Sequence, residues 1–413
     1  MSKDLVKKGV ERLEWAKEHM KVLEKVRNEL TKKKSLKGMR IGMALHVEAK
    51  TGMLALTLRE AGADVRLASC NPLSTDDSVS VALNEHYELP TFAKKGETSK
   101  EYYSNLNSVL DHEPDILVDD GCDLISLVHT KRKKLLDVVK GANEETTTGI
   151  IRLKAMEQDG ALKFPVISVN DAKMKYLFDN RYGTGQSTID GVISSTNLLV
   201  AGKKVVIAGY GGCGRGIAMR IDGMGGNVTV TEVDRVRAIE ARLDGFLVQP
   251  MMDAIRDADF VITATGCKDV VSERHLKIAK DGCLLANSGH FDNEVSKVAL
   301  KKLSKKKRKV RDFVEEYSLK NGRKVYLLGE GRLINLVAGQ GHPVEIMDMS
   351  FSIQALCARY LAENYKKLKN KVYDVPRSID DMVAKIRLKS WGIKIDKLSP
   401  EQKDYLSGWS EGT

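Results

Sequence analysis

Residues 203–234, KKVVIAGYGGCGRGIAMRIDGMGGNVTVTEVD, decide the fold of this chain. A short apolar strand at 205–208 leads into a turn that contains Gly209, Gly211 and Gly214, and a helix follows. A GxGxxG turn between a strand and a helix is typical of dinucleotide binding, because its glycines let the backbone approach a pyrophosphate at the helix N-terminus. The three glycines are therefore predicted cofactor contacts. The alternative is a glycine-rich turn that holds no ligand.

The strand that follows this helix, at residues 228–231, ends at Glu232. An acid about 20 residues after the glycines is expected to accept hydrogen bonds from the adenosine ribose hydroxyls. Its negative charge repels a 2′-phosphate, so that NAD is favoured over NADP. Two buried-type strands within 258–266 and 282–292 continue the pattern and predict the far half of the same nucleotide-binding unit.

Upstream of this unit, four apolar stretches predict the strands of a second parallel sheet. Each stretch is followed by polar residues, and ligands in open α/β sheets bind beyond the carboxyl ends of the strands. We therefore expect one pocket at this edge. The strands are predicted at 39–46, 64–69, 115–119 and 164–169, and the polar residues after them are His46, Glu48, Asn71, Ser74, Asp119, Asp120, Asn170 and Asp171.

The alternation of strands and helices predicts an α/β fold with two doubly wound parallel-sheet domains and a small C-terminal segment. The first 30 residues read as one amphipathic helix, and a long helix from Val344 is expected to return to the first domain. The last 40 residues are expected to form a charged extension with two short helices. The predicted domains are a substrate domain at 1–182 and 338–374, an NAD domain at 183–337 and a C-terminal extension at 375–413.

Composition indicates a folded chain. With 413 residues, 42% of them hydrophobic and 30% charged, two or three domains are expected. No apolar run approaches the ~20 residues of a membrane span. The first 20 residues carry charges every few positions, which does not fit a secretory signal. Six scattered cysteines without a CxxC pair predict reduced thiols and a cytoplasmic protein.

The formal net charge is +11, which raises the question of an anionic partner. The basic runs lack the interleaved aromatic residues of a single-strand binder, so that neither nucleic acid nor a membrane is an expected partner. KKKRKV, within residues 301–311, also looks like a nuclear localisation signal, but a solvated helix face or a loop is favoured for all four basic runs. The runs lie at residues 31–34, 131–134, 301–311 and 365–371.

Several polar clusters exceed what a hydrophobic core tolerates without pairing or function. Lys175 and Asp179 are four residues apart and would share one face of a helix, which an ordinary surface salt bridge also explains. Thr146, Thr147 and Thr148 read equally well as the N-cap of a helix. No set of metal ligands is expected.

Together, the clusters resemble the S-adenosylhomocysteine hydrolase family from about Lys37 to the last ten residues. The matching motifs are SCNPLSTDD (69–77), DDGCDL (119–124), EETTTG (144–149), VND…K…FDN (169–180), GYGGCGRG (209–216), TATGC (263–267), NSGHFD (287–292) and EGRLINL…GHP (330–343). The resemblance implies a homotetramer with tightly bound NAD that acts in one-carbon metabolism. In the family, transient oxidation at the ribose 3′-carbon acidifies the C4′ proton, homocysteine leaves by β-elimination, water adds, and the ketone is reduced again.

The resemblance also implies roles for individual residues. Lys175 and Asp179 would contact the ribose hydroxyls, and Lys175 would help to remove the 3′-OH proton, for which its pKa would have to be depressed by burial. Asp120, His46 and His290 would handle protons at C4′ and C5′. The implied substrate contacts are Glu48, Lys50, Thr51, Glu145, Asn170 and His342. The implied NAD contacts are Thr146, Thr147, Thr148, Asn180, Thr265 and Asn335, in addition to the glycines and Glu232.

Two departures from the family concern the cofactor. Thr184 occupies a place where many members carry a cysteine beside the nicotinamide, so that any redox role of that cysteine is absent. The sequence 405–413 lacks the Lys and Tyr with which many members reach the NAD of a neighbouring subunit. NAD affinity and subunit contacts are therefore expected to differ from those members.

A third departure concerns the purine. Many relatives have His-Met-Thr-x-Glu/Gln-Thr where this chain has HVEAKT at 46–51, so that Lys50 replaces a hydrogen-bond acceptor. A lysine donates but cannot accept, which suits a 6-oxo purine such as hypoxanthine. S-adenosylhomocysteine is the expected substrate, and S-inosylhomocysteine is the alternative. In the adenosyl case Lys50 would pair with Glu48 or another acid, and backbone groups would read adenine.

Two rival functions are weighed from the same residues. A plain NAD-dependent dehydrogenase would accumulate reduced cofactor in proportion to substrate, whereas a hydrolase would release thiol without net reduction. A non-enzymatic regulator on this fold would keep the glycine turn and lose the proton-transfer groups. His46, Asp120, Lys175, Asp179 and His290 are all present, which argues against a regulator.

Overall fold

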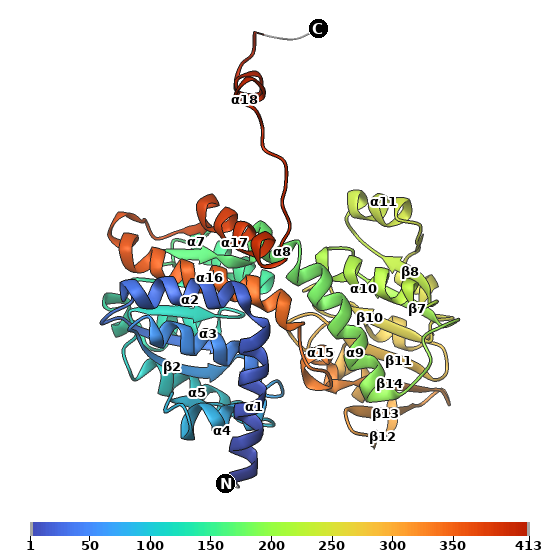
Figure 1. Cartoon of the computed structure of the whole chain (residues 1–413). Helices are drawn as coiled ribbons and strands as arrows, with labels where there is room; N and C mark the ends of the chain where they lie inside the picture. The colour runs from blue at the N-terminus through green and yellow to red at the C-terminus, as the bar shows by residue number, and fades with distance from the viewer. Residues whose placement is uncertain (1–2, 411–413) are drawn as a thin grey trace.

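The computed structural model describes residues 3–410 and contains two α/β units that lie side by side (Figure 1). The first unit is built on a seven-stranded sheet in which all neighbouring strands are parallel. In spatial order its strands are β15 (Val372–Asp374), β6 (Val166–Ser168), β5 (Gly141–Glu144), β4 (Ile116–Asp119), β1 (Arg40–Leu45), β2 (Asp64–Ser69) and β3 (Thr91–Phe92). The four strands predicted for this sheet are present within two residues of their expected bounds.

β5 was missed by the sequence analysis because its residues, GANE, are half polar. All four are nevertheless buried, since β5 lies between β4 and β6 in the middle of the sheet. Asn143 donates a hydrogen bond to the backbone carbonyl of Gln354. The polar side chains of this strand are thus accommodated by tertiary contacts, which the local sequence pattern does not predict.

The second unit carries an eight-stranded sheet with parallel pairing from β14 to β9. β13 pairs antiparallel with both β12 and β14 at one edge. The α/β class with a Rossmann-type second unit is confirmed, with this antiparallel edge added. In spatial order the strands are β12 (Ser304–Arg311), β13 (Val314–Leu319), β14 (Lys324–Leu328), β11 (Cys283–Asn287), β10 (Phe260–Thr263), β7 (Lys204–Ala208), β8 (Asn227–Thr231) and β9 (Leu247–Val248).

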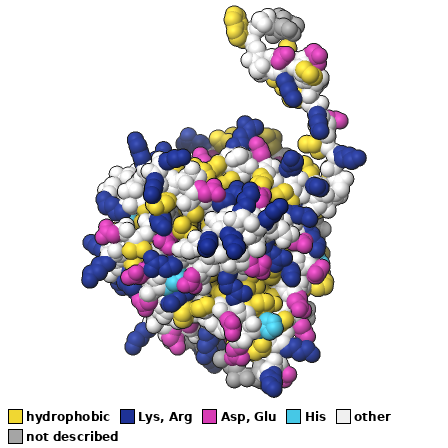
Figure 2. Space-filling model, turned by 60° about the vertical axis from the view of Figure 1, so that its left-hand side comes forward, with side chains coloured by type: hydrophobic (Ala, Val, Ile, Leu, Met, Phe, Trp, Pro, Cys, Tyr) yellow, Lys and Arg dark blue, Asp and Glu magenta, His cyan; other side chains and the backbone are white. Residues whose placement is uncertain are grey.

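The basic run at 301–311 was expected to be a helix face or a loop, and that prediction was wrong for most of it. Only its first residues end α14 (Lys297–Leu303), and the rest forms the edge strand β12. Lys307 and Arg308 form ion pairs with Glu315 and Glu316 of the neighbouring β13. Lysines on an edge strand also discourage pairing with another sheet, which gives this run a structural role. Figure 2 shows Lys and Arg interspersed with Asp and Glu on the face it presents.

The N-terminal segment forms two helices, α1 (Lys3–His19) and α2 (Lys21–Lys33), where one was predicted. The helical conformation is interrupted at Met20. The buried carboxylate of Asp348 accepts hydrogen bonds from the backbone N–H groups of Val22 and Leu23 at the start of α2. A side chain more than 300 residues away therefore caps α2, which explains why the local pattern missed the break. The other helices of the first unit before its last strand are α3 (Ala49–Glu60), α4 (Asp77–Glu85), α5 (Ser99–Leu110), α6 (Asp123–Thr130), α7 (Thr147–Gln158) and α8 (Lys173–Tyr176).

A π-helical turn, Asp179–Gly183, carries the chain into α9 (Thr184–Thr196) and the second unit. The helices there are α10 (Gly212–Gly223), α11 (Arg235–Leu243), α12 (Met251–Ala254), α13 (Glu273–Leu276), α14 and α15 (Ile334–Val337). The chain then returns in α16 (Val344–Asn364), which packs against α2 and α3 of the first unit. Most of α16 is buried there, including Phe351 and Leu356.

The C-terminal segment was predicted to be one extension from residue 375. Its first part, α17 (Arg377–Ser390), packs against α16 and α2 and buries Ile379 and Val383 in the core of the first unit. Beyond it, an arm that we define as residues 391–410 rises away from both units and includes α18 (Pro400–Ser407) (Figure 1). None of the helices in residues 3–410 has the length and apolar character that crossing a membrane requires.

Candidate functional site

A single large cavity of about 1120 Å³ opens between the carboxyl edges of the two sheets. Loops that follow β1, β4, β5 and β6 line one side, and loops that follow β7, β8, β10 and β11 line the other. The cavity wall includes each of the predicted catalytic, substrate and cofactor residues with the exception of Gly214. Of the polar residues expected at the strand ends, it does not include Asn71, Ser74 and Asp119. A Cβ at position 214 would lie 1.8 Å from the carbonyl oxygen of Gly209. Gly214 thus allows the helix to pack closely on the turn and does not face the cavity.

Asp120 lies between two imidazole rings at the bottom of this cavity. Its carboxylate oxygens are 3.5 Å from Nε2 of His46 and 3.6 Å from Nδ1 of His290. Burial lowers the pKa of His46 to about 4, so that the ring is neutral near pH 7. The Oγ of Ser74 lies 2.7 Å from Nδ1 of His46 and fixes the orientation of the ring. The cluster therefore combines a carboxylate with proton carriers from both units.

Lys175 lies among carboxylates and amides of the first unit. Its Nζ donates to the Oδ1 atoms of Asn180 at 2.8 Å and Asn170 at 3.3 Å. Carboxylate oxygens of Asp179 and Glu145 lie 3.5 Å and 3.8 Å from it. The i,i+4 pair of Lys175 and Asp179 is thus fully buried, which excludes the surface salt bridge considered from the sequence.

The expected depression of the Lys175 pKa was wrong. Burial alone would lower the pKa, but the negative charges of Asp179 and Glu145 raise it above its ordinary value. Burial would likewise raise the pKa of Asp179, yet the charges of Lys175 and His342 hold it below its ordinary value. Burial raises the pKa of Glu145 to about 8 although Lys175 opposes the shift. The resting cluster is therefore a protonated lysine beside an ionised aspartate.

The loop that carries His342 is fastened to the turn between the units. Nδ1 of His342 lies 3.1 Å from Asp179, and its Nε2 lies 3.3 Å from Oγ1 of Thr184. The same Thr184 hydroxyl is 3.5 Å from the thiol of Cys213, which belongs to the glycine-rich turn. Position 184 thus carries a hydroxyl that bridges the loop of His342 and the glycine-rich turn.

Glu48 and Lys50 lie at the wall of the first unit. Nζ of Lys50 is 2.8 Å from a Glu48 carboxylate oxygen and donates to the backbone carbonyl of Gln340 at 3.0 Å. Glu48 also caps α3 by accepting from the backbone N–H groups of Lys50 and Thr51. Lys50 therefore shares its charge with Glu48 and ties the wall to the loop that carries His342.

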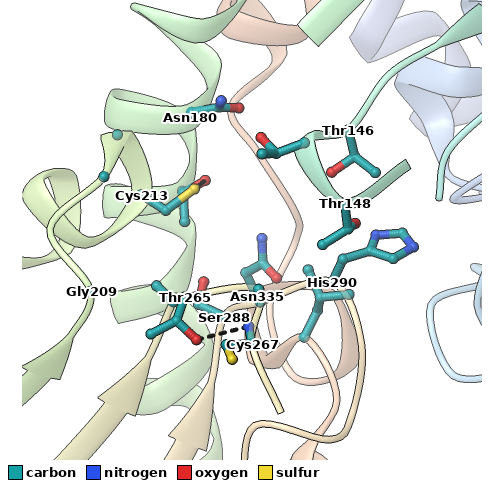
Figure 3. Close-up of a pocket in the computed structure, with 18 of the residues that line it drawn as sticks. Thr146, Thr148, Asn180, Gly209, Cys213, Thr265, Cys267, Ser288, His290 and Asn335 are labelled. Atoms are coloured by element: carbon teal, nitrogen blue, oxygen red, sulfur yellow. Dashed lines mark hydrogen bonds between the residues drawn. The ribbon is translucent and has the colours of Figure 1, made fainter. Parts of the chain in front are cut away.

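The opposite wall fits a dinucleotide. Gly209 has a φ of 94°, in the region that favours glycine, and Glu232 at the end of β8 accepts from the backbone N–H of Tyr210 in the turn. Thr148 and Asn335 line the same cavity, and the buried Oγ1 of Thr148 and Oδ1 of Asn335 have no hydrogen-bond partner (Figure 3). Buried polar atoms without partners are costly, so that two of them facing one cavity from its two sides indicate a polar ligand.

Comparison with known proteins gives the family. The model of the S-adenosyl-L-homocysteine hydrolase matches residues 2–136, and the model of the NAD-binding domain of the same enzyme matches residues 180–341. An adenosylhomocysteinase from Thermoplasma volcanium is 59% identical over 98% of this chain and 99% of that protein. The chain belongs to the S-adenosyl-L-homocysteine hydrolase family.

Membership in this family makes the chain a hydrolase that acts on an S-nucleosyl-L-homocysteine with NAD as its cofactor. Its relatives carry two names. An S-inosyl-L-homocysteine hydrolase from Methanocaldococcus jannaschii is 56% identical over 99% of this chain and 98% of that protein. An adenosylhomocysteinase from Archaeoglobus fulgidus is also 56% identical, over 98% of this chain and 100% of that protein. Overall identity therefore does not separate the two purines.

The sequence analysis assigned no role to several residues that shape the site of this hydrolase. Buried Asn287 donates to the backbone carbonyls of Gly289, Phe291 and Gly331 and thereby shapes the loop of His290. Buried Glu294 accepts from the backbone N–H groups of Thr265 and Gly266. The sequence signal that could have identified Asn287 and Glu294 is their position within and just after the motif NSGHFD. Ser350 and Gln354 on α16 were also missed, because no local pattern connects that helix with the cavity.

Proposed function

We propose that this enzyme hydrolyses S-adenosyl-L-homocysteine reversibly to adenosine and homocysteine. The observation that carries the choice of adenine is the pairing of Lys50 with Glu48 and with the carbonyl of Gln340. A lysine engaged in this way is the arrangement that the adenosyl substrate requires, because an unpaired ammonium group would face the 6-amino group of adenine as a second donor. The adenosylhomocysteinase from Thermoplasma volcanium, at 59% identity, supports the same choice.

The proposed cofactor contacts are Thr146, Thr147, Thr148, Asn180, Gly209, Gly211, Glu232, Thr265 and Asn335. When bound there, NAD would supply reversible acceptance of a hydride from the ribose 3′-carbon. Its pyrophosphate would meet the glycine-rich turn, and the unpartnered atoms of Thr148 and Asn335 would gain partners. Gly214 is proposed only as the packing glycine of the turn.

Lys175 and Asp179 are the proposed contacts of the ribose hydroxyls, with Glu145 and Asn170 beside them. Lys175 must lose its own proton before it can take one from the 3′-OH. A hydroxyl inserted between Lys175 and Asp179 would weaken the attraction that raises the pKa of Lys175, and it would favour the neutral amine. The protonation state of Lys175 would in this way respond to substrate binding.

Asp120, His46 and His290 are the proposed carriers of protons at C4′ and C5′. The carboxylate of Asp120 lies between the two rings and is the proposed acceptor of the C4′ proton. His46 is neutral near pH 7 because burial lowers its pKa, so that it is free to accept a proton from the water that enters at C5′. His290 comes from the second unit, so that the cluster is complete only when the two units are close together.

The second candidate is the same chemistry with S-inosyl-L-homocysteine. Its specific support is that Nζ of Lys50, with two partners among the described residues, has a third hydrogen to donate to the 6-oxygen of hypoxanthine. The relative from Methanocaldococcus jannaschii named for this substrate supports it further. Because one unsatisfied hydrogen bond in a purine site is strongly discriminating, a clear preference is expected either way.

Homocysteine release from the two substrates tests the proposal. We expect kcat/KM to be at least about tenfold higher for the adenosyl substrate than for the inosyl substrate. Bound NAD, identified after denaturation of the purified enzyme, should not become reduced in proportion to turnover. A preference for the inosyl substrate would establish the second candidate in place of the first, and stoichiometric reduction of the cofactor without thiol release would overturn both.

A cytoplasmic homotetramer belongs to the same proposal. The arm at 391–410 supports an oligomer because it is rich in exposed apolar side chains, among them Ile395, Leu406 and Trp409. Apolar surface on a segment that stands away from its own subunit is a feature of interaction sites.

A further inference from the structure

Two fully buried polar side chains of α16 lie directly behind the catalytic carboxylates. Oγ of Ser350 donates to Oδ2 of Asp179 at 3.0 Å, and Nε2 of Gln354 donates to Oε2 of Glu145 at 2.6 Å. Ser350 and Gln354 are four residues apart, which places them on one face of the helix. Neither side chain lines the cavity. They can therefore act on substrate only through the two carboxylates.

The two carboxylates are held in the same way. In Asp179, Oδ2 is fixed by Ser350 while Oδ1 lies 3.5 Å from Nζ of Lys175. In Glu145, Oε2 is fixed by Gln354 while Oε1 lies 3.8 Å from the same Nζ. One oxygen of each acid is thus bound from behind by α16, and the other is turned toward Lys175 and the cavity.

This arrangement does not serve stability well. The amide oxygen of Gln354 and Oε1 of Glu145 are buried without a hydrogen-bond partner. An apolar residue of similar volume at position 354 would avoid the cost of the unpaired amide oxygen. The hydrogen bond from the amide nitrogen of Gln354 to Glu145 is the best explanation for a polar residue at this position.

We propose that Ser350 and Gln354 are positioning residues that orient Asp179 and Glu145 toward Lys175 and the ribose hydroxyls. The inference rests on the proposed roles of these carboxylates in the hydrolase reaction. It makes α16, which follows the NAD-binding unit in the chain, part of the support of the catalytic site in the first unit. Without the two bonds, each carboxylate would be free to rotate and to pair differently with Lys175.

The chain offers a matched control for Ser350. Ser352 lies on the same helix, is equally buried, and its hydroxyl donates only to the backbone carbonyl of Asp348 one turn earlier. Ser350→Ala and Ser352→Ala each remove one buried hydroxyl from α16. We expect Ser350→Ala to lower kcat about tenfold, and Ser352→Ala to leave kcat within about twofold of the unmodified enzyme. The NAD content and the urea midpoint of the two variants should match each other.

Gln354→Met keeps the volume of the side chain and removes the donor to Glu145. Because that donor lowers the pKa of Glu145, which lies near 8, its loss should move the step of the kcat profile that reports ionisation of Glu145 to higher pH. KM is expected to change less than kcat, since the carboxylate stays in the cavity but is no longer oriented. A residue with a merely structural role would lower the amount of folded enzyme without moving the pH profile.

Each variant is compared with the unmodified enzyme on both the adenosyl and the inosyl substrate. The ratio of kcat between variant and unmodified enzyme tests the positioning role with either substrate. The kcat/KM values of the unmodified enzyme for the two substrates test the proposed function. Equal kcat values for Ser350→Ala and Ser352→Ala, together with an unchanged pH profile for Gln354→Met, would overturn the inference and leave the proposed function intact.

Discussion

Lys175 shows how chemistry at the residue scale depends on neighbours that the sequence does not reveal. The motif places Lys175 four residues before Asp179, and the role that the family resemblance implies for Lys175 required its pKa to be depressed by burial. The fold adds Glu145 from the loop after β5 and Asp120 from the loop after β4, and together with Asp179 these carboxylates raise the pKa of Lys175 instead. The identity of the group was predictable from the motif, but its charge was not, because the charge is set by residues from other strands.

Replacement of Lys175 tests its proposed role directly. Lys175→Ala should reduce kcat by about 10²–10⁴-fold, the usual range for loss of a group that transfers a proton. NAD released on denaturation should stay at the level of the unmodified enzyme, because Lys175 is not a proposed cofactor contact and its neighbour Asn180 keeps its hydrogen bond to Asn170. Full activity of this variant would show that the assignment is wrong.

The neutral state of His46 predicts a particular dependence of stability on pH. Its folded pKa of about 4 lies below the unfolded value of 6.5, so that the unfolded chain binds more protons between these values. Stability from this residue is therefore present above pH 6.5 and is lost as pH falls toward 4. Relative to His46→Gln, the free energy of unfolding should fall by about 2 kcal/mol between pH 7 and pH 5, measured by urea titration without NAD. Parallel curves for the two proteins would contradict the neutral assignment.

At the scale of elements, strong periodic signals were predictable and long-range supports were not. The strands that precede His46 and Gly209 were expected within two residues of their observed bounds, since both are short apolar runs that end in polar or glycine residues. The break between α1 and α2 was missed because the carboxylate that caps α2 comes from α16. The support of Asp179 and Glu145 by α16 was missed for the same reason.

The cap of α2 can be removed by one substitution. Asp348 accepts from two backbone N–H groups and lies 3.3 Å from the guanidinium of Arg387 on α17, with all of these groups buried. Asp348→Ala leaves that guanidinium without a partner and should lower the free energy of unfolding by about 3–5 kcal/mol. Asp348→Asn should cost less, because it keeps an acceptor. As a control on the same helix, exposed Glu345→Ala should change stability by no more than about 0.5 kcal/mol in urea unfolding. A loss as small as that of the control would mean that the cap contributes little.

On the scale of the whole molecule, the site is a property of two sheets together. Each sheet presents its carboxyl edge to the same cavity, so that most of the polar residues expected there, but not Asn71, Ser74 and Asp119, converge on it. His290 from one unit and Asp120 from the other meet at 3.6 Å. Strand patterns predicted both edges, but only the three-dimensional arrangement shows that the edges face each other.

The last prediction concerns the arm at residues 391–410 and the assembly of subunits. After Ile393 the hydrogen bonds of the arm run within the segment, as in the capping of α18 by Ser399. Trp409 is 95% exposed, and Ile395 and Leu406 are each 68% exposed. Burial of such side chains against another subunit is favourable by roughly 1.5–3 kcal/mol for each large apolar residue. A chain that ends at Ser390 keeps α17 in its core and loses the arm. Light scattering after size-exclusion chromatography should give a tetramer for the full chain and a smaller species for the shortened one. Equal subunit numbers for the two chains would show that the arm does not hold the assembly together.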